Sequence, residues 1–242
     1  AAGETLTIVF PMWNEIAIID RSIDVAHAAA GLLLDEGAIR DYEIVVVDDA
    51  STDGSAERVA ELALSDGRLR LIRHDRNRKL GATVRSGFAA AKGSVVLATG
   101  ADLPFDLREL SRAYHLLATY AADIAHVYNA LVKGAFGLRV RDVNFSAKLV
   151  RAEVLDAIEL QSEGSFIDVE LLVRAQRAGF RVVQFGVDSF PRWTGRSTLA
   201  SAGVIATMLR EMVTIGPRLG AADAEAVMAA PLVIVSADDF GL

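Results

Sequence analysis

The 242-residue sequence contains no cysteine, and this absence excludes several kinds of chemistry. Disulfide bonds, thiolate nucleophiles and zinc sites built from cysteine all need a sulfur atom that the chain does not provide. No apolar run approaches the roughly 20 residues that a membrane-spanning helix requires. The first residues do not combine a basic stretch with an apolar one, so the sequence predicts no signal peptide. We therefore expect a soluble protein, or a soluble part of a longer one, located in the cytoplasm or at the inner face of the membrane.

Positive charge and aromatic residues are also scarce. Lysine and arginine together number 25, aspartate and glutamate 32, and the net charge is −7. A general nucleic-acid-binding protein is usually basic, so we expect no nucleic-acid partner. An anionic small substrate stays open, because a local arginine cluster can act against the net charge. Hydrophobic residues make up 52% of the chain and aromatic residues 7%, which favours an α/β core built from Ala, Val and Leu.

Strands and helices alternate through the first half of the chain. Apolar runs predict the strands, and helical spacing of apolar residues predicts the intervening helices. Pro11 is expected to stop the first strand. The alternation is typical of a mostly parallel sheet with helices on both faces, so the sequence predicts an α/β fold. The strands are expected at 6–10, 43–47, 69–72 and 94–98, and the helices at 16–36, 55–64, 79–91 and 107–120.

The second half has a less regular pattern. A stretch rich in Ala, Gly and Asp, residues 216–231, indicates a linker. The expected elements are a strand at 124–127, a short strand and a helix within 143–158, a helix at 167–178, a strand at 181–187 and a helix at 199–215.

Acidic and amide side chains follow three of the predicted strands. Asn14 and Glu15 come after the first, Asp48 and Asp49 after the second, and Asp102 after the fourth. Each one alone could be a helix cap or a turn residue. The carboxyl ends of parallel strands, however, share one edge of a sheet, which is where ligands bind in open α/β sheets. Clustered carboxylates need a compensating cation or hydrogen-bond donors, and a divalent metal with a diphosphate would supply these.

Three segments carry a resemblance to a known family: 11–15 (PMWNE), 47–55 (VDDASTDGS) and 101–103 (ADL). In their order and spacing they resemble the motifs of inverting family-two glycosyltransferases, closest to the polyprenyl-phosphate (dolichyl-phosphate mannose synthase-like) sugar transferases. The resemblance covers about residues 5–215. It implies a GT-A type nucleotide-diphospho-sugar transferase fold. It also implies sugar transfer, with inversion, from a UDP- or GDP-sugar to a polyprenyl phosphate or another membrane lipid, with Mg²⁺ or Mn²⁺ as cofactor.

The resemblance assigns a nucleotide-binding role to residues that follow the first two predicted strands and to residues of the helix predicted at 79–91. Within this set, Asp49 matches the position that hydrogen-bonds the base, and residues 77–87 match a segment that closes over the nucleotide. A solvated helix residue is the alternative for Arg85. The nucleotide-binding set is Pro11, Asn14, Glu15, Asp48, Asp49, Lys79, Gly81 and Arg85.

Asp102 matches the last acid of the family's Asp-x-Asp motif, which implies a metal ligand and catalytic residue. A metal ion held there would stabilise the leaving diphosphate as a Lewis acid. The first acid of that motif is missing, because Gly100 stands in its place. Weaker metal binding is therefore expected, and a catalytically degenerate nucleotide- or partner-binding relative is an alternative. An unrelated nucleotidyltransferase is a further alternative.

The acceptor side of the reaction is expected in the second half. Arg192, Arg196 and Ser197 match a basic loop on the diphosphate or the acceptor phosphate, and a plain surface loop is the alternative. Asp168 opens a predicted helix, where the helix dipole alone favours a carboxylate. As a catalytic residue it would take the proton of a hydroxyl acceptor. A lipid phosphate is already anionic, and Asp168 would then mainly orient groups.

The last part of the chain carries two further predictions. The amphipathic helix Leu199 to Ile215 either packs on the catalytic domain or makes a peripheral membrane contact. Residues 231–242 resemble the opening strand of carbohydrate deacetylases. The expected organisation is a glycosyltransferase domain at 1–215, a linker at 216–231 and the first strand of a truncated second domain at 232–242. The four histidines show no evident acid partner, and structural roles are expected for them.

Overall fold

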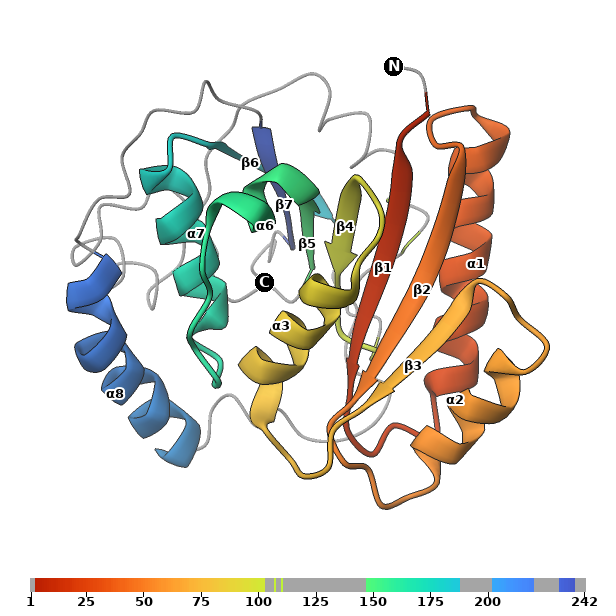
Figure 1. Ribbon diagram of the computed structural model, residues 1–242, viewed down its shortest axis with the longest axis horizontal. Coiled ribbons are helices and arrows are strands. Elements are labelled where there is room, and N and C mark those ends of the chain that lie inside the picture. The colour runs from red at the N-terminus through yellow and green to blue at the C-terminus, as the bar shows by residue number, and fades with distance from the viewer. Residues whose placement is uncertain are drawn as a thin grey trace, which may run out of the picture.

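The computed structural model describes residues 3–102, 107, 110, 147–187, 202–219 and 231–237 (Figure 1). The predicted strand at 124–127 and most of the predicted helix at 107–120 lie outside these residues. So do Arg192, Arg196 and Ser197, whose predicted roles stay predictions. In the described part of the chain, no helix combines the length and the hydropathy needed to cross a bilayer.

The described strands form one seven-stranded sheet in the order β3-β2-β1-β4-β5-β7-β6. Within it, β5 runs antiparallel to both of its neighbours, while all the other pairs are parallel. The prediction of a mostly parallel sheet is confirmed. The strands are β1 Thr5–Met12, β2 Asp41–Asp48, β3 Leu69–Arg73, β4 Val95–Ala98, β5 Lys148–Arg151, β6 Arg181–Val187 and β7 Pro231–Ala237.

Helices cover both faces of the sheet, as predicted. Alternate side chains of β1 enter different cores, because successive residues of a strand point to opposite faces. Ile8 and Phe10 pack with Leu33 of α1, whereas Val9 packs with Phe88 of α3. Figure 1 shows α1 and α2 along one side of the strands, and α3, α7 and α8 along the other. The helices are α1 Ile19–Asp35, α2 Ser55–Ala63, α3 Lys79–Ala90, α6 Ala152–Ala157, α7 Ile167–Arg177 and α8 Ala202–Leu219.

The prediction that Pro11 stops the first strand is wrong, because β1 continues to Met12 with Pro11 opposite Val47. Hydrogen bonds explain why proline is tolerated there. The carbonyl of Met12 accepts from Asp49 on the β2 side, whereas the carbonyl of Val9 accepts from Thr99 on the β4 side. Alternation directs the amide position of Pro11 towards β4, beyond the last paired residues. The missing N–H therefore removes no ladder bond.

The C-terminal elements also differ from the expectation in their boundaries. Helix α8 reaches Leu219, so the first residues of the predicted linker 216–231 are helical. Strand β7 lies in the same sheet, between β5 and β6. Residues 231–237 therefore complete the sheet. The division at 216–231 and a second domain beginning at 232–242 stay predictions.

Candidate functional site

The loops that follow β1 and β2 are joined by hydrogen bonds at the carboxyl edge of the sheet. The backbone N–H of Asn14 donates to Ser51 Oγ at 2.9 Å, and the backbone N–H of Thr52 donates to Asn14 Oδ1 at 2.8 Å. This reciprocal pair holds Asn14 in the left-handed conformation, with φ 57°. Asparagine tolerates that conformation better than most residues. Asn14, one of the predicted nucleotide-binding residues, is thus fixed against the second loop.

Two further bonds join these loops just before the first helix. The backbone N–H of Glu15 donates to Ser55 Oγ at 2.9 Å, and that of Ile16 donates to Asp53 Oδ2 at 3.0 Å. Helix α1 begins at Ile19, later than the predicted start at Ile16. Burial acts to raise the pKa of Asp53, but hydrogen bonds from Ser55 and Ile16 outweigh it, and the pKa lies below its ordinary value.

Asp49 lies at this edge with its carboxylate buried. Oδ1 contacts His74 Nδ1 at 2.7 Å and accepts from the backbone N–H of Arg78 at 2.8 Å, while Oδ2 accepts from that of Lys79 at 2.8 Å. His74 is held in turn by Ser86, whose Oγ is 2.9 Å from Nε2. Asp49 therefore fixes the segment that leads into α3. Its predicted bond to the nucleotide base stays a prediction.

The expectation that no histidine has an acid partner is wrong for two of them. His74 pairs with Asp49, and His27 Nε2 lies 2.7 Å from Asp66. The partners lie far from the histidines in the sequence, so no local pattern revealed them. Each of these two side chains connects separate elements through its acid, and His74 does so inside the candidate site. The structural roles expected for the histidines stay a prediction.

Asp48 points away from Asp49, although the two are neighbours in sequence. Strand alternation places Asp48 on the α1–α2 face, and Asp49 contacts the start of α3 on the other face. Asp48 is fully buried, and its Oδ1 accepts from the backbone N–H of Ser51 at 3.1 Å. Its Oδ2 has no hydrogen-bond partner among the described residues, and the nearest cation, Arg73 Nε, is 3.7 Å away. An unsatisfied buried carboxylate oxygen is costly, and a local rearrangement around a ligand could supply a donor.

Asp102 follows β4, whose neighbour in the sheet is β1. The hydroxyl of Ser22, on the first turns of α1, donates to the carbonyl of Ala101. The carbonyl of Ile18 lies 3.0 Å from the same hydroxyl, whose single proton is shared between the two carbonyls, and the N–H of Ile18 donates to the carbonyl of Glu15. A short series of contacts thus links Ala101, the residue before Asp102, to the loop after β1, and the predicted role of Asp102 stays a prediction.

The described residues contain no group of three or more acids and histidines placed to hold a metal ion. Asp102 is half-buried, and Gly100 offers no second carboxylate. Magnesium is commonly held by one or two carboxylates together with substrate phosphates and water. A single acid at this position therefore fits a metal that arrives with a diphosphate, and does not fit a metal site formed by the protein alone.

Asp168 reaches the same edge because β5 is reversed. Lys148, the first residue of β5, lies opposite Ala98 at the carboxyl end of β4. Its ammonium is 2.7 Å from Asp168 Oδ1 in the first turn of α7, and the side chains are 3% and 17% exposed. Sequence reasoning missed Lys148. The available signal was a lone cation among the apolar residues of a short strand, at 147–150.

Gly81 and Arg85 both contact the segment that precedes α7. The N–H of Gly81 donates to the carbonyl of Glu163 at 2.9 Å, and a Cβ on Gly81 would lie 2.5 Å from the carbonyl oxygen of Ser162. Arg85 Nη1 donates to the carbonyl of Leu160 at 3.2 Å. The Arg85 side chain is nevertheless 26% exposed, so the alternative of a solvated helix residue stays open. The predicted nucleotide contacts of Gly81 and Arg85 stay predictions.

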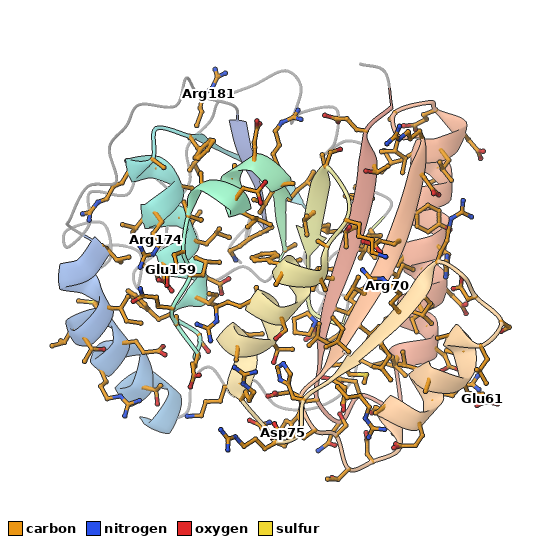
Figure 2. All side chains as sticks on the ribbon, in the orientation of Figure 1. Glu61, Arg70, Asp75, Glu159, Arg174 and Arg181 are labelled. Carbon is orange, nitrogen blue, oxygen red and sulfur yellow. The ribbon has the colours of Figure 1, made fainter. Side chains whose placement is uncertain are left out.

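Lys79 combines an exposed side chain with a strained backbone. Its φ is 68°, in the left-handed region that costs a residue with a Cβ roughly 1–2 kcal/mol. This conformation lets consecutive N–H groups, of Arg78 and Lys79, converge on Asp49. Asp75, labelled in Figure 2, marks this edge of the sheet between β3 and α3.

Comparison with known proteins identifies the family. Residues 7–165 match the model for "Glycosyl transferase family 2". The chain is 28% identical over 246 residues to glycosyltransferase AglD of Haloferax volcanii, covering 90% of this chain and 39% of that protein. It is 25% identical over 231 residues to polyprenol monophosphomannose synthase of Mycolicibacterium smegmatis, covering 84% of each. The chain thus spans about two fifths of the length of AglD.

A solved structure supports the fold. The mannosyltransferase PcManGT of Pyrobaculum calidifontis, in complex with GDP-Man and Mn²⁺, superposes with a TM-score of 0.59 at 20% identity. The match covers 92% of this chain and 66% of that one. The mixed sheet with helices on both faces is therefore the GT-A type that the resemblance implies.

Proposed function

The chain belongs to glycosyl transferase family 2, and on this premise we propose that it transfers a sugar from a nucleotide-diphosphate sugar to a lipid phosphate with inversion. The observation that carries the proposal is the convergence at one sheet edge. The loops after β1, β2 and β4 meet there, and the reversed β5 adds Lys148 and Asp168 to the same edge. Ligands of open α/β sheets bind at this edge.

On the donor side, the nucleotide lies against the joined loops after β1 and β2. Pro11, Asn14 and Glu15 approach it from one loop, and Asp48 and Asp49 from the other. The buried Oδ2 of Asp48, which accepts no hydrogen bond within the part of the chain that the structure describes, supports this assignment, because a donor from the bound nucleotide or from a rearranged loop would satisfy it. The start of α3, with Lys79, Gly81 and Arg85, closes the donor side.

A divalent cation, Mg²⁺ or Mn²⁺, is held by Asp102 together with the donor diphosphate, and when bound it stabilises the negative charge that develops on the leaving group. The relative in the PcManGT structure has GDP-Man and Mn²⁺ bound, which supports a metal of this class. Arg192, Arg196 and Ser197 are proposed to add contacts to the diphosphate or to the acceptor phosphate, as bidentate arginines do.

The transfer itself needs no proton acceptor if the acceptor is a lipid phosphate. An anionic phosphate oxygen attacks the anomeric carbon from the face opposite the diphosphate. The new C–O bond forms as the old one breaks, and the nucleoside diphosphate leaves with the electron pair. Asp168, fixed by Lys148, orients the acceptor side of the site. With a hydroxyl acceptor, Asp168 would instead take the proton.

A peripheral membrane contact is proposed through the helix predicted at Leu199 to Ile215. In the described part of α8, Ile215 is buried in the core, so one face packs on the catalytic domain, whereas Val213 is 71% exposed. An exposed apolar residue on such a helix supports a contact with the surface where a lipid acceptor resides.

The test is a transfer assay with the purified chain, UDP- and GDP-sugars, a polyprenyl phosphate, and Mg²⁺ or Mn²⁺. We expect sugar-lipid product and nucleotide release only when donor, acceptor and metal are all present. Failure to bind any nucleotide, with or without metal, would overturn the proposal. Binding without turnover across donors and acceptors would support the second candidate, a catalytically degenerate relative, which Gly100 in the metal motif favours.

A further inference from the structure

Residues 160–164, which precede α7, are held by two buried carboxylates from two different helices. Figure 1 shows this segment descending between α3 and α8. Glu170, on α7, accepts from the backbone N–H groups of Gln161 at 3.0 Å and Ser162 at 2.7 Å. Its charge is balanced by Arg174, one turn further along the helix, whose Nε is 2.8 Å from Oε1. Arg174 is labelled in Figure 2.

The second carboxylate is Glu211, which lies on α8 and is 7% exposed. Its Oε1 accepts from the backbone N–H groups of Glu163 at 3.1 Å and Gly164 at 3.0 Å, and its Oε2 accepts from Ser162 Oγ at 3.1 Å. These partners are all neutral. Burying a carboxylate is costly unless hydrogen bonds compensate, so Glu211 and this segment constrain each other closely.

The opposite side of the same segment holds the start of α3. The carbonyl of Glu163 accepts from Gly81 at 2.9 Å, and the neighbouring N–H groups of Arg78 and Lys79 are both 2.8 Å from the carboxylate of Asp49. The α-carbon of Gly81 packs directly against the backbone of residues 162–164, so closely that a Cβ would not fit between them. A continuous series of backbone and side-chain contacts thus joins α8 to the donor-side acid.

We infer that Glu211 is a positioning residue for the donor site. From α8 it fixes the 160–164 segment, which fixes the first turn of α3, which in turn orients Asp49 and Lys79. The inference rests on the proposed function in one respect, because it takes Asp49 and Lys79 as donor-side residues. It adds a residue outside the family motifs, 47 to 49 positions beyond the residues that it contacts and on the helix proposed to approach the membrane.

The test compares Glu211→Ala, Glu211→Gln and the matched control Arg210→Gln, an exposed neighbour on the same helix. Donor affinity is measured by calorimetric titration of UDP- and GDP-sugars with Mn²⁺, and KM is measured separately for donor and acceptor. Coupling through packed networks is typically worth a severalfold to about thirtyfold change in affinity. We expect Glu211→Ala to weaken donor binding about tenfold and to leave the acceptor KM unchanged. Glu211→Gln, which keeps an acceptor oxygen, should weaken it about threefold, and Arg210→Gln should have no effect.

Hydrogen exchange distinguishes an effect that reaches the start of α3 from one confined to residues 160–164. Glu211→Ala should speed exchange at the amides of Glu163 and Gly164, and also at those of Gly81 and Lys79. Faster exchange confined to Glu163 and Gly164, with donor affinity unchanged, would overturn the inference. Hydrogen exchange at the α3 amides can be measured without nucleotide. If the wild-type chain binds no nucleotide, the proposed function fails, while the exchange rates still test whether Glu211 fixes the start of α3. If Glu211→Ala does not fold, Glu211→Gln and Ser162→Ala carry the same comparison.

Discussion

The two halves of the candidate site are held together by different forces. In the donor half, at residues 3–102, the loops are joined by hydrogen bonds between small polar side chains and backbone N–H groups, as between Asn14 and Ser51. In the acceptor half, at 147–187 and 202–219, buried charges connect separate elements, as in the pair of Lys148 and Asp168 or the carboxylate of Glu211.

This difference bears on how the site responds to change. Losing one neutral hydrogen bond between loops typically costs about 1 kcal/mol, whereas removing one partner of a buried ion pair costs about 3–5 kcal/mol. The acceptor half should therefore be the more sensitive of the two to single substitutions. The donor half should tolerate them in stability while losing ligand affinity.

The largest effect is expected from Lys148→Met. It leaves the carboxylate of Asp168 without its buried cation, and the free energy of unfolding should fall by about 3 kcal/mol. The measurement is a urea titration. The matched control is Arg68→Met in the donor half, whose partner Asp41 is exposed, so that loss should be about 0.5 kcal/mol. Equal losses of unfolding free energy for the two variants would contradict the proposed difference in sensitivity between the donor and acceptor halves.

The next effect concerns the junction of the halves, at Asp102. Asp102→Asn should lower the rate of sugar transfer about 100-fold, because the metal loses its charged ligand. Gly100→Asp should restore the missing acid and raise Mn²⁺ affinity about tenfold, measured as the metal concentration that gives half-maximal transfer. Transfer that is insensitive to both substitutions would show that the metal is held elsewhere.

A smaller effect, of opposite sign, is expected at Lys79. Lys79→Gly removes the Cβ from a left-handed backbone and should raise the free energy of unfolding by about 1 kcal/mol. The same change should weaken donor binding, because the exposed ammonium is lost. Lys79→Ala keeps the backbone strain and loses the charge, so it should weaken binding without stabilising the fold. Thermal unfolding and calorimetric titration measure the two effects separately.

The smallest effect is a pH dependence of stability in the donor half. The pKa of Asp53 is lowered in the folded state from its ordinary value of 3.8. A lowered carboxyl pKa stabilises the fold above the unfolded value, and this contribution is lost as the pH falls through the folded value. Wild type should therefore lose slightly more stability than Asp53→Asn between pH 5 and about pH 3. Parallel pH profiles for the two proteins would contradict this.

Much of the donor half could be predicted from the sequence, because each of its strands is a contiguous apolar run followed by its own polar residues. The order of the motifs placed Glu15, Asp49 and Asp102 at one edge without any long-range information. Strand alternation already directs Asp48 and Asp49 to opposite faces, but the same reasoning could not tell which residues each one meets, since these partners lie in separate elements. Pro11 was misjudged because its tolerance depends on where β4 ends.

The acceptor half could be predicted only as a set of elements. Strand 181–187 was predicted with its observed bounds, and α7 within one residue. The position of Lys148, however, follows from the reversal of β5, and no local pattern gives the direction of a four-residue strand. The role of Glu211 depends on a segment about 50 positions earlier in the chain, where it meets neutral donors rather than a basic residue.

The place of β7 between β5 and β6 has a consequence for biosynthesis. During translation β6 leaves the ribosome well before β7, so it has no neighbour in this sheet until residues 231–237 emerge. Until then the nascent polypeptide exposes unpaired edges on both β5 and β6, of the kind that chaperones shield from aggregation. The two sections of the described sheet are consequently joined only when residues 231–237 are made.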